Sequence, residues 1–222
     1  MEQLIAMIEL QMGLNVSTNG DGWVNGITKN GKKINWQRCI YMECAEMIDS
    51  FAWKHWKSID KEADWANLQI EVVDVWHFII SLIIEQQGYQ KEAIANEMAL
   101  VPSFQNLLLQ PSGFGVQDEI MLKIEEIMLL VLQDKSAKTV TEAFFDLVQM
   151  SNLNLDSLYK LYIGKNILNQ FRQDHGYKDG SYVKIWSGVE DNVVMQKLLE
   201  PLGMFLPSEL YGMLEQEYVL AK

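Results

Sequence analysis

Residues 65–87 read Trp65-Ala-Asn-Leu-Gln-Ile-Glu-Val-Val-Asp-Val-Trp-His-Phe-Ile-Ile-Ser-Leu-Ile-Ile-Glu-Gln-Gln87, and this stretch decides the fold class. Apolar side chains go nearly all the way round a helical projection of it, which predicts a central, buried helix. A β-strand would also suit its β-branched residues, but a strand of this length would be far too long. The polar residues inside it follow one stripe at helical steps of three, three and four: Glu71, Asp74, His77 and Ser81.

Helical periodicity continues through most of the chain, so the sequence predicts an all-α fold. Further helices are expected at 3–15, 35–57, 91–109, 116–134, 139–151, 155–173 and 208–220, with a shorter one starting at Asp191. The candidate caps are Asp64, Thr139, which has Glu142 three residues later, and Asn154. Residues 17–33 contain four glycines and are expected to form a loop. No repeat or linker is visible, which favours a single domain over 1–222.

Composition excludes several classes of protein. Of the 222 residues, 49% are apolar, which excludes a disordered chain, and the net charge of −12 argues against non-specific binding to nucleic acid or an anionic membrane. The longest apolar run, Val75 to Ile84, is too short to span a bilayer, and the first six residues lack the basic side chains of a signal peptide. The spacing of Cys39 and Cys44 suits neither a disulfide nor a zinc site, so we expect two free thiols in a cytoplasmic protein.

Two acidic pairs form the main candidate site, and each has its two carboxylates three residues apart on one helix face. The pairs are Glu43 with Glu46 and Glu71 with Asp74. Four carboxylates with no thiol and at most one imidazole suit a hard cation, Mg²⁺ or Mn²⁺. Two other interpretations stay open: a solvated acidic face, and a di-iron site, which Asp74-Val-Trp-His77 matches only in part.

A basic stretch follows at 160–184, where five basic and two acidic side chains give a local net charge of +3. Lys165, Asn169 and Arg172 lie on one helix face, and the loop Gly176-Tyr-Lys-Asp-Gly-Ser-Tyr182 carries Lys178 between two glycines. This arrangement suits a phosphate clamp, although a solvated helix end followed by a turn would have the same pattern. Metal-binding carboxylates together with a phosphate clamp predict hydrolysis of a phosphoryl group. The chain has no Walker A sequence and no GxGxxG.

These motifs and their surroundings resemble a known family. Glu-x-x-Glu at 43–46, followed after 24 residues by Glu-x-x-Asp at 71–74, matches the signature of the all-α NTP pyrophosphatases, which include MazG-like and dCTPase enzymes. The surrounding sequence resembles the dimeric all-α dUTPases within that group, particularly those of ε-proteobacteria. It comprises Arg38-Cys-Ile-Tyr-Met-Glu-Cys-Ala-Glu-Met-Ile-Asp-Ser50, Trp53-Lys-His-Trp-Lys57, Glu71-Val-Val-Asp-Val-Trp-His-Phe78, Tyr162-Ile-Gly-Lys-Asn-Ile-Leu-Asn-Gln-Phe-Arg172 and the loop 176–182. The resemblance is weakest over 89–152 and after residue 190.

The resemblance implies a four-helix bundle core with additional helices, among which 89–152 is a candidate peripheral part. It implies a homodimer that hydrolyses dUTP, and also dUDP, to dUMP. Diphosphate is released from dUTP, which limits uracil incorporation into DNA and supplies dUMP. The implied cofactor is Mg²⁺, with two or three ions per active site and Mn²⁺ as a substitute.

The resemblance also implies roles for individual residues. Glu43, Glu46, Glu71 and Asp74 would bind the metal ions. One glutamate of the first pair, Glu46 rather than Glu43, would orient or deprotonate the attacking water. The substrate-binding residues form three groups: Gln11 and Asn15 near the uracil; Trp53, His77 and Phe78 around base and sugar, with Lys57 in the same motif; and Lys165, Asn169, Arg172, Lys178 and Tyr182 on the phosphates.

Two alternative functions remain. A broader NTP pyrophosphatase, acting on dCTP or non-standard nucleotides, would have the same metal site and different base contacts. A non-catalytic helical interaction module would use the acidic stripe as a solvated face or a docking surface. Such a module would not be stabilised by Mg²⁺ and would release no phosphate.

Overall fold

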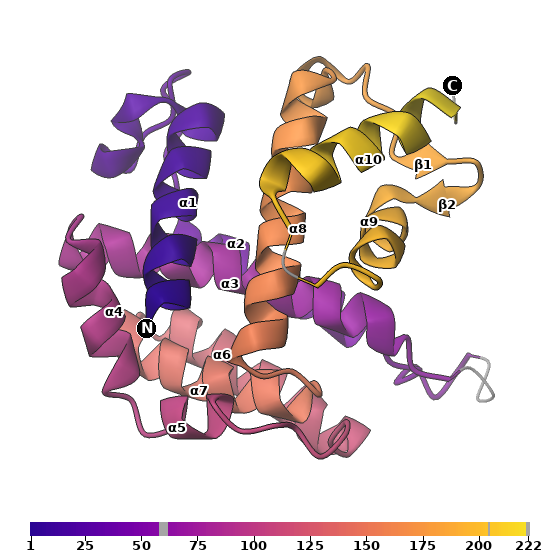
Figure 1. Cartoon of the computed structure of the whole chain (residues 1–222). Helices are drawn as coiled ribbons and strands as arrows, with labels where there is room; N and C mark the ends of the chain where they lie inside the picture. The colour runs from indigo at the N-terminus through magenta and orange to yellow at the C-terminus, as the bar shows by residue number, and fades with distance from the viewer. Residues whose placement is uncertain (58–61, 204, 221–222) are drawn as a thin grey trace. The chain divides into compact units, whose positions relative to one another are not determined.

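The structure is a computed structural model that describes residues 1–57, 62–203 and 205–220, and it is mainly helical, as the sequence predicts (Figure 1). The elements in chain order are α1 Glu2–Asn19, η1 Asp21–Asn25, α2 Trp36–Ile48, α3 Trp65–Gln87, α4 Lys91–Ala99, α5 Phe104–Leu107, α6 Gln117–Leu132, α7 Ala137–Met150, α8 Leu155–Asp174, η2 Tyr177–Asp179, β1 Ile185–Trp186, β2 Val189–Glu190, α9 Asp191–Leu199 and α10 Pro207–Leu220. The chain divides into two compact units, Met1–Leu158 and Tyr159–Lys222. The single domain expected from the sequence stays a prediction.

Helix α3 is the central helix of the first unit, and its bounds are those that the sequence predicts. Asp64 caps its first turn by accepting a hydrogen bond from the backbone N–H of Asn67 at 2.9 Å. Gly88 follows its end with a positive φ of 88°. Among the described helices, only α3 is long and apolar enough to cross a membrane. Of its apolar window, 72% is buried inside the fold, and the core helix of a globular protein passes the same test.

Four helices of the first unit close a ring. α3 packs on α2 and α7, and α6 packs on the same two helices. Trp76 of α3 stacks on Phe144 of α7, with ring centroids 4.9 Å apart and planes 3° from parallel. This ring is the four-helix bundle that the resemblance implies. Both α6 and α7 come from 89–152, so the stretch expected as a candidate peripheral part supplies half of the bundle.

Helix α2 ends at Ile48, so the helix that the sequence predicts as far as residue 57 is shorter than expected. The chain turns because Phe51 is buried against Trp65, with ring centroids 5.8 Å apart. The Ser50 carbonyl also accepts the backbone N–H of Asp64 at 2.8 Å, which ties the turn to the start of α3. The aromatic and basic residues that follow therefore lie outside any helix.

Three other predicted boundaries are wrong. Helix α1 continues to Asn19, four residues beyond its predicted end and into the stretch expected as a loop. The helix expected at 91–109 is two helices, α4 and α5, because Pro102 lacks the backbone N–H that a continuous helix would need. Helix α7 starts at Ala137, and its cap is Ser136 instead of Thr139. The Ser136 hydroxyl accepts the backbone N–H of Thr139 at 3.3 Å, so the expected cap residue lies inside the first turn.

The second unit contains most of α8, together with β1, β2, α9 and α10. Helix α8 begins after Asn154, whose Oδ1 accepts the backbone N–H of Ser157 at 3.0 Å, so this predicted cap is confirmed. Four buried aromatic side chains contact one another inside the unit: Phe171, Tyr182, Trp186 and Tyr218.

The hairpin formed by β1 and β2 was not expected from the sequence. Ser187 and Gly188 form its two-residue turn, with φ of 49° and 85°. Such turns require positive φ at both positions, and Ser-Gly between the apolar residues Trp186 and Val189 is a usable signal for one. The hairpin leaves the fold class all-α, and it leads directly into α9 at Asp191, the start that the sequence predicts.

Candidate active site

Three glutamates from two helices lie close together in the first unit. Glu43 and Glu46 lie one turn apart near the end of α2, and Glu71 lies in the second turn of α3. One carboxylate oxygen from each lies within 4.8 Å of the other two. Glu43 and Glu71 are half-buried, and Glu46 is exposed. The packing of α2 on α3 therefore brings Glu71 to the pair Glu43 and Glu46, which is distant from it in sequence.

The donor set of this acidic group fits a hard divalent cation. Its ligands are carboxylate oxygens, and octahedral Mg²⁺ with bonds of about 2.1 Å holds neighbouring oxygens about 3 Å apart. Oxygens within 4.8 Å of one another need only small side-chain rotations to reach that separation. A cation would also relieve the repulsion between the carboxylates. Asp74, the fourth predicted ligand, lies one turn after Glu71 and outside the group of three.

A buried polar network joins α1 to α3 in the first unit. His77 Nδ1 and Gln11 Oε1 lie 2.7 Å apart, and His77 donates because an amide oxygen only accepts. Gln11 Nε2 donates to Asn15 Oδ1 at 3.0 Å and to Ser81 Oγ at 3.1 Å. Asn15 Nδ2 also donates to Ser81 Oγ, at 3.0 Å. The network therefore fixes three residues that the resemblance assigns to the base, with Ser81 between them.

The aromatic residues predicted around the base lie in two places. Phe78 of α3 is half-buried against Trp36, with ring centroids 6.2 Å apart. Trp53 is exposed beside a hollow of about 460 Å³, and its indole N–H donates to Asp49 Oδ1 at 3.3 Å. The other walls of this hollow are Ile48, Asp118, Met121, Leu122 and Glu125. An exposed indole at the edge of an apolar hollow can stack on a planar base. Lys57 is exposed in the segment that follows.

In the second unit, two of the three predicted phosphate-binding residues of α8 are buried, and the third, Asn169, is half-buried. Lys165 is 2% exposed and Arg172 is 7% exposed. Arg172 donates from Nε and Nη2 to the two carboxylate oxygens of Asp191, at 2.8 and 2.7 Å, and from Nη1 to Asn169 Oδ1 at 3.2 Å. The Tyr182 hydroxyl donates to Asp191 Oδ2 at 2.8 Å. These side chains form one polar cluster centred on Asp191. The alternative interpretation of this helix face, a solvated helix end, does not describe it.

The charges of this cluster determine the ionisation of Asp191. Burial raises the pKa of Asp191, but the hydrogen bonds and charge of Arg172, aided by Tyr182 and Lys165, hold the pKa below its usual value. Burial and the hydrogen bond to Asp191 raise the pKa of Tyr182. At neutral pH the cluster therefore contains a carboxylate, a guanidinium and a neutral phenol.

The loop from Gly176 to Tyr182 is held by its own hydrogen bonds. Gly176 and Gly180 both have left-handed backbone conformations, with φ of 88° and 80°. The backbone N–H and the hydroxyl of Ser181 both donate to Asp179 Oδ1, at 3.0 and 2.6 Å. The glycines are therefore required by the turn itself, and Lys178 is exposed between them.

A family model described as dUTPase matches residues 3–177, which is most of the chain. The chain belongs to the dUTPase family. The activity of this family is the hydrolysis of dUTP, so the protein is an enzyme, a dUTP diphosphatase, and the resemblance to the all-α dUTPases is confirmed. No curated protein gives a significant match.

The part of the dUTPase that the family model matches includes both acidic pairs and the buried network. It ends before Lys178, Tyr182 and Asp191. The sequence did not identify Ser81, Asp191 or Asn192 as site residues. The position of Ser81 at the end of the polar stripe of α3 was a usable signal for its place in the network. For Asp191 and Asn192 the sequence indicates only the start of a helix. That signal does not predict which side chains the two residues contact.

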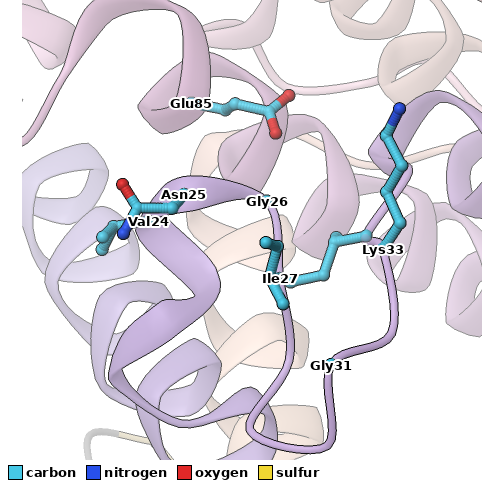
Figure 2. A pocket seen from close by; sticks show the side chains of 8 residues that line it. Val24, Asn25, Gly26, Ile27, Gly31, Lys33 and Glu85 are labelled. Carbon is cyan, nitrogen blue, oxygen red and sulfur yellow. The ribbon is translucent and has the colours of Figure 1, made fainter.

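A further hollow of the dUTPase, about 450 Å³ in volume, lies between residues 24–34 and the end of α3 (Figure 2). Glu85 of α3 reaches towards Gly26, and Lys33 lies on the other side. Burial raises the pKa of Glu85. The residues that line this hollow include none of the sequence-predicted site residues, so it lies apart from the candidate active site.

Proposed function

We propose that this dUTPase is a Mg²⁺-dependent enzyme that hydrolyses dUTP to dUMP and diphosphate, and dUDP to dUMP and phosphate. The observation that carries the proposal is the acidic group, whose three carboxylates lie within 4.8 Å of one another in a member of this family. Carboxylate ligands suit Mg²⁺, with Mn²⁺ as a substitute. Glu43, Glu46, Glu71 and Asp74 together would hold two or three ions.

Each carboxylate has a proposed part in the reaction. Bound Mg²⁺ would polarise phosphate oxygens and lower the pKa of a bound water. Glu46 is the exposed member of the acidic group, so it is the residue that accepts the proton of the attacking water, with Glu43 beside it. The water oxygen forms a new bond to phosphorus while the bridging P–O bond between the α and β phosphorus atoms breaks.

Base recognition belongs to the buried network and the aromatic residues of the first unit. Gln11 and Asn15 offer amide groups that can complement the uracil edge, and Ser81 fixes their orientation. A cytosine edge would leave these amide groups without hydrogen-bond partners. The loss of binding free energy would be far larger than the loss from one missing methyl contact in an apolar pocket. The remaining contacts to base and sugar are assigned to Trp53, Lys57, His77 and Phe78.

Phosphate binding belongs to the second unit. Arg172 and the two lysines supply the positive charge that a triphosphate needs in a chain of net charge −12. The residues assigned here are Lys165, Asn169, Arg172, Lys178 and Tyr182. We propose that they close over the phosphates when the nucleotide binds, and so exclude water from the reaction.

The first experiment is a product assay with dUTP and dUDP, with Mg²⁺ and with excess EDTA. Glu46→Gln and Glu71→Gln are expected to lower kcat by about 100-fold or more, because each removes a charge at the reacting centre. Glu119→Gln, on an exposed turn of α6, is the matched control and is expected to retain full activity. Full activity of both site variants, or in EDTA, would show that the acidic group is not the metal centre.

The second experiment separates the proposal from its alternatives. A dUTP-specific enzyme is expected to leave dCTP and dTTP nearly unhydrolysed at equal concentration. Comparable turnover of dCTP would favour a broader NTP pyrophosphatase. Absence of turnover with every nucleotide would favour a non-catalytic helical module.

The oligomeric state and location are proposed from the family resemblance. We propose a homodimer that acts in the cytoplasm. Light scattering from the purified protein is expected to give twice the chain mass of 25.6 kDa. A single-chain mass at micromolar concentration would contradict the dimer without affecting the reaction.

A further inference from the structure

The carboxylate of Asp191 is the centre of the polar cluster in the second unit. It is 1% exposed, and both of its oxygens accept charge-assisted hydrogen bonds from Arg172, at 2.8 and 2.7 Å. Oδ2 also accepts the Tyr182 hydroxyl, at 2.8 Å. One buried carboxylate therefore sets the positions of two side chains that are assigned to the phosphates.

The next residue, Asn192, orients the rest of the cluster. Its Oδ1 accepts from Lys165 Nζ at 2.8 Å and from Arg172 Nη2 at 3.2 Å. Asn169 completes the connection by accepting from Arg172 Nη1. The first turn of α9 thus binds, directly or through Arg172, four of the five residues assigned to the phosphates.

The position of Asp191 is fixed by the hairpin and by the aromatic core of the second unit. Its backbone N–H donates to the Lys184 carbonyl at 2.9 Å, across the ends of the β1–β2 hairpin. Trp186 of that hairpin packs on Phe171 of α8, with ring centroids 5.7 Å apart. The hairpin and the aromatic core therefore hold the start of α9 against α8, and Asp191 cannot leave Arg172 without disturbing both.

This arrangement reduces the cost of binding a phosphate. Free lysine and arginine side chains lose substantial rotamer entropy when they are fixed, and that loss weakens binding. Here the rotamers of Arg172 and Lys165 are already restricted by their acceptors on α9. Removing Asp191 would take away a counter-charge that accepts two hydrogen bonds from the buried guanidinium of Arg172. Its orientation would then change before any phosphate arrives.

We infer that Asp191 is a positioning residue for triphosphate binding, and that Asn192 assists it through Lys165 and Arg172. The inference rests on the proposed function, because it assumes that α8 and the loop 176–182 bind the phosphates. Neither residue lies within the matched family region, which ends at residue 177.

The test measures steady-state kinetics with dUTP and competitive inhibition by deoxyuridine, which has the base and sugar but no phosphate. Asp191→Asn is expected to raise KM for dUTP about tenfold or more, the scale of a lost charge-assisted hydrogen bond. The inhibition constant of deoxyuridine is expected to stay within about twofold, because the first unit is unchanged. Asp191→Glu keeps the charge and is expected to recover part of the loss.

The matched control is Asp174→Asn. Asp174 lies in the same unit and accepts hydrogen bonds from Tyr211 and Gln170, at 2.9 and 2.7 Å. It is exposed and lies outside the cluster around Asp191, so KM is expected to be unchanged. A purely structural role for Asp191 would lower kcat through an inactive fraction and leave KM as it was. That outcome would overturn the inference.

Two further outcomes are informative. A loss of the fluorescence of buried Trp186 in Asp191→Asn would show that this variant is misfolded, and Asn192→Ala is then measured in its place. An unchanged KM for dUTP in Asn192→Ala also overturns the inference. If the unaltered protein fails to hydrolyse dUTP, the proposed function fails first and the inference fails with it. Normal dUTP turnover with an unchanged KM in Asp191→Asn rejects the inference alone.

Discussion

Gly176 and Gly180 provide a test of backbone strain at single residues, because both have positive φ but different surroundings. A Cβ on Gly176 would collide with the Ser181 hydroxyl and lie 2.8 Å from Asp179 Oδ1, whereas a Cβ on Gly180 would meet nothing within 4 Å. Gly180→Ala is expected to cost about 1–2 kcal/mol, the cost of a left-handed conformation alone. Gly176→Ala is expected to cost more, measured by urea unfolding. Equal costs would contradict the turn geometry.

Ser81 provides a second test at the residue scale, since its hydroxyl is the shared acceptor of Gln11 and Asn15. Ser81→Ala leaves two buried amide donors with fewer acceptors, and we expect a loss of about 1–3 kcal/mol of unfolding free energy. KM for dUTP should rise as well, because the two amides lose their fixed orientation. Ser17→Ala, at an exposed position of the same α1, is the control and should change stability by less than about 0.5 kcal/mol.

At the scale of elements, the sequence predicts what local signals encode and fails where a distant contact decides. The bounds of α3 follow from a continuous apolar stretch between Asp64, which caps it, and Gly88. The end of α2 does not follow, because burial of Phe51 depends on Trp65, beyond a loop. For the same reason the acidic group was predictable from two local motifs, whereas the contacts of Asp191 with residues of α8 were not.

The packing of α8 on α9 depends on Gly164. A Cβ at this position would collide with the Leu199 side chain and lie 2.8 Å from Met195 Sδ. Gly164→Ala is expected to destabilise the second unit by about 1–3 kcal/mol through overpacking. Adding Leu199→Ala removes the obstructing side chain, so the double variant should be more stable than the sum of the two single changes predicts. Strict additivity of the unfolding free energies would show that the two positions do not meet.

At the scale of the whole molecule, the division into two units predicts that Mg²⁺ stabilises the first unit more than the second. A cation that binds the native acidic group stabilises the first unit by mass action, by about 2.7 kcal/mol at 100 times its Kd. The chain contains a natural reporter for each unit. Trp186 is the only one of seven tryptophans beyond residue 158, and it is buried. The variant Trp186→Phe therefore reports the first unit alone, and its difference from the unaltered protein reports the second.

We expect Mg²⁺ to raise the urea midpoint of Trp186→Phe and to leave the midpoint of the Trp186 signal nearly unchanged, with EDTA reversing the shift. The reason is that the acidic group lies wholly within Met1–Leu158, so the metal contributes its binding free energy to that unit. Glu71→Gln should abolish the shift, whereas Glu119→Gln should not. Equal shifts of both signals would show one cooperative domain, the organisation that the sequence predicts, and no shift in either would argue against a metal at the acidic group.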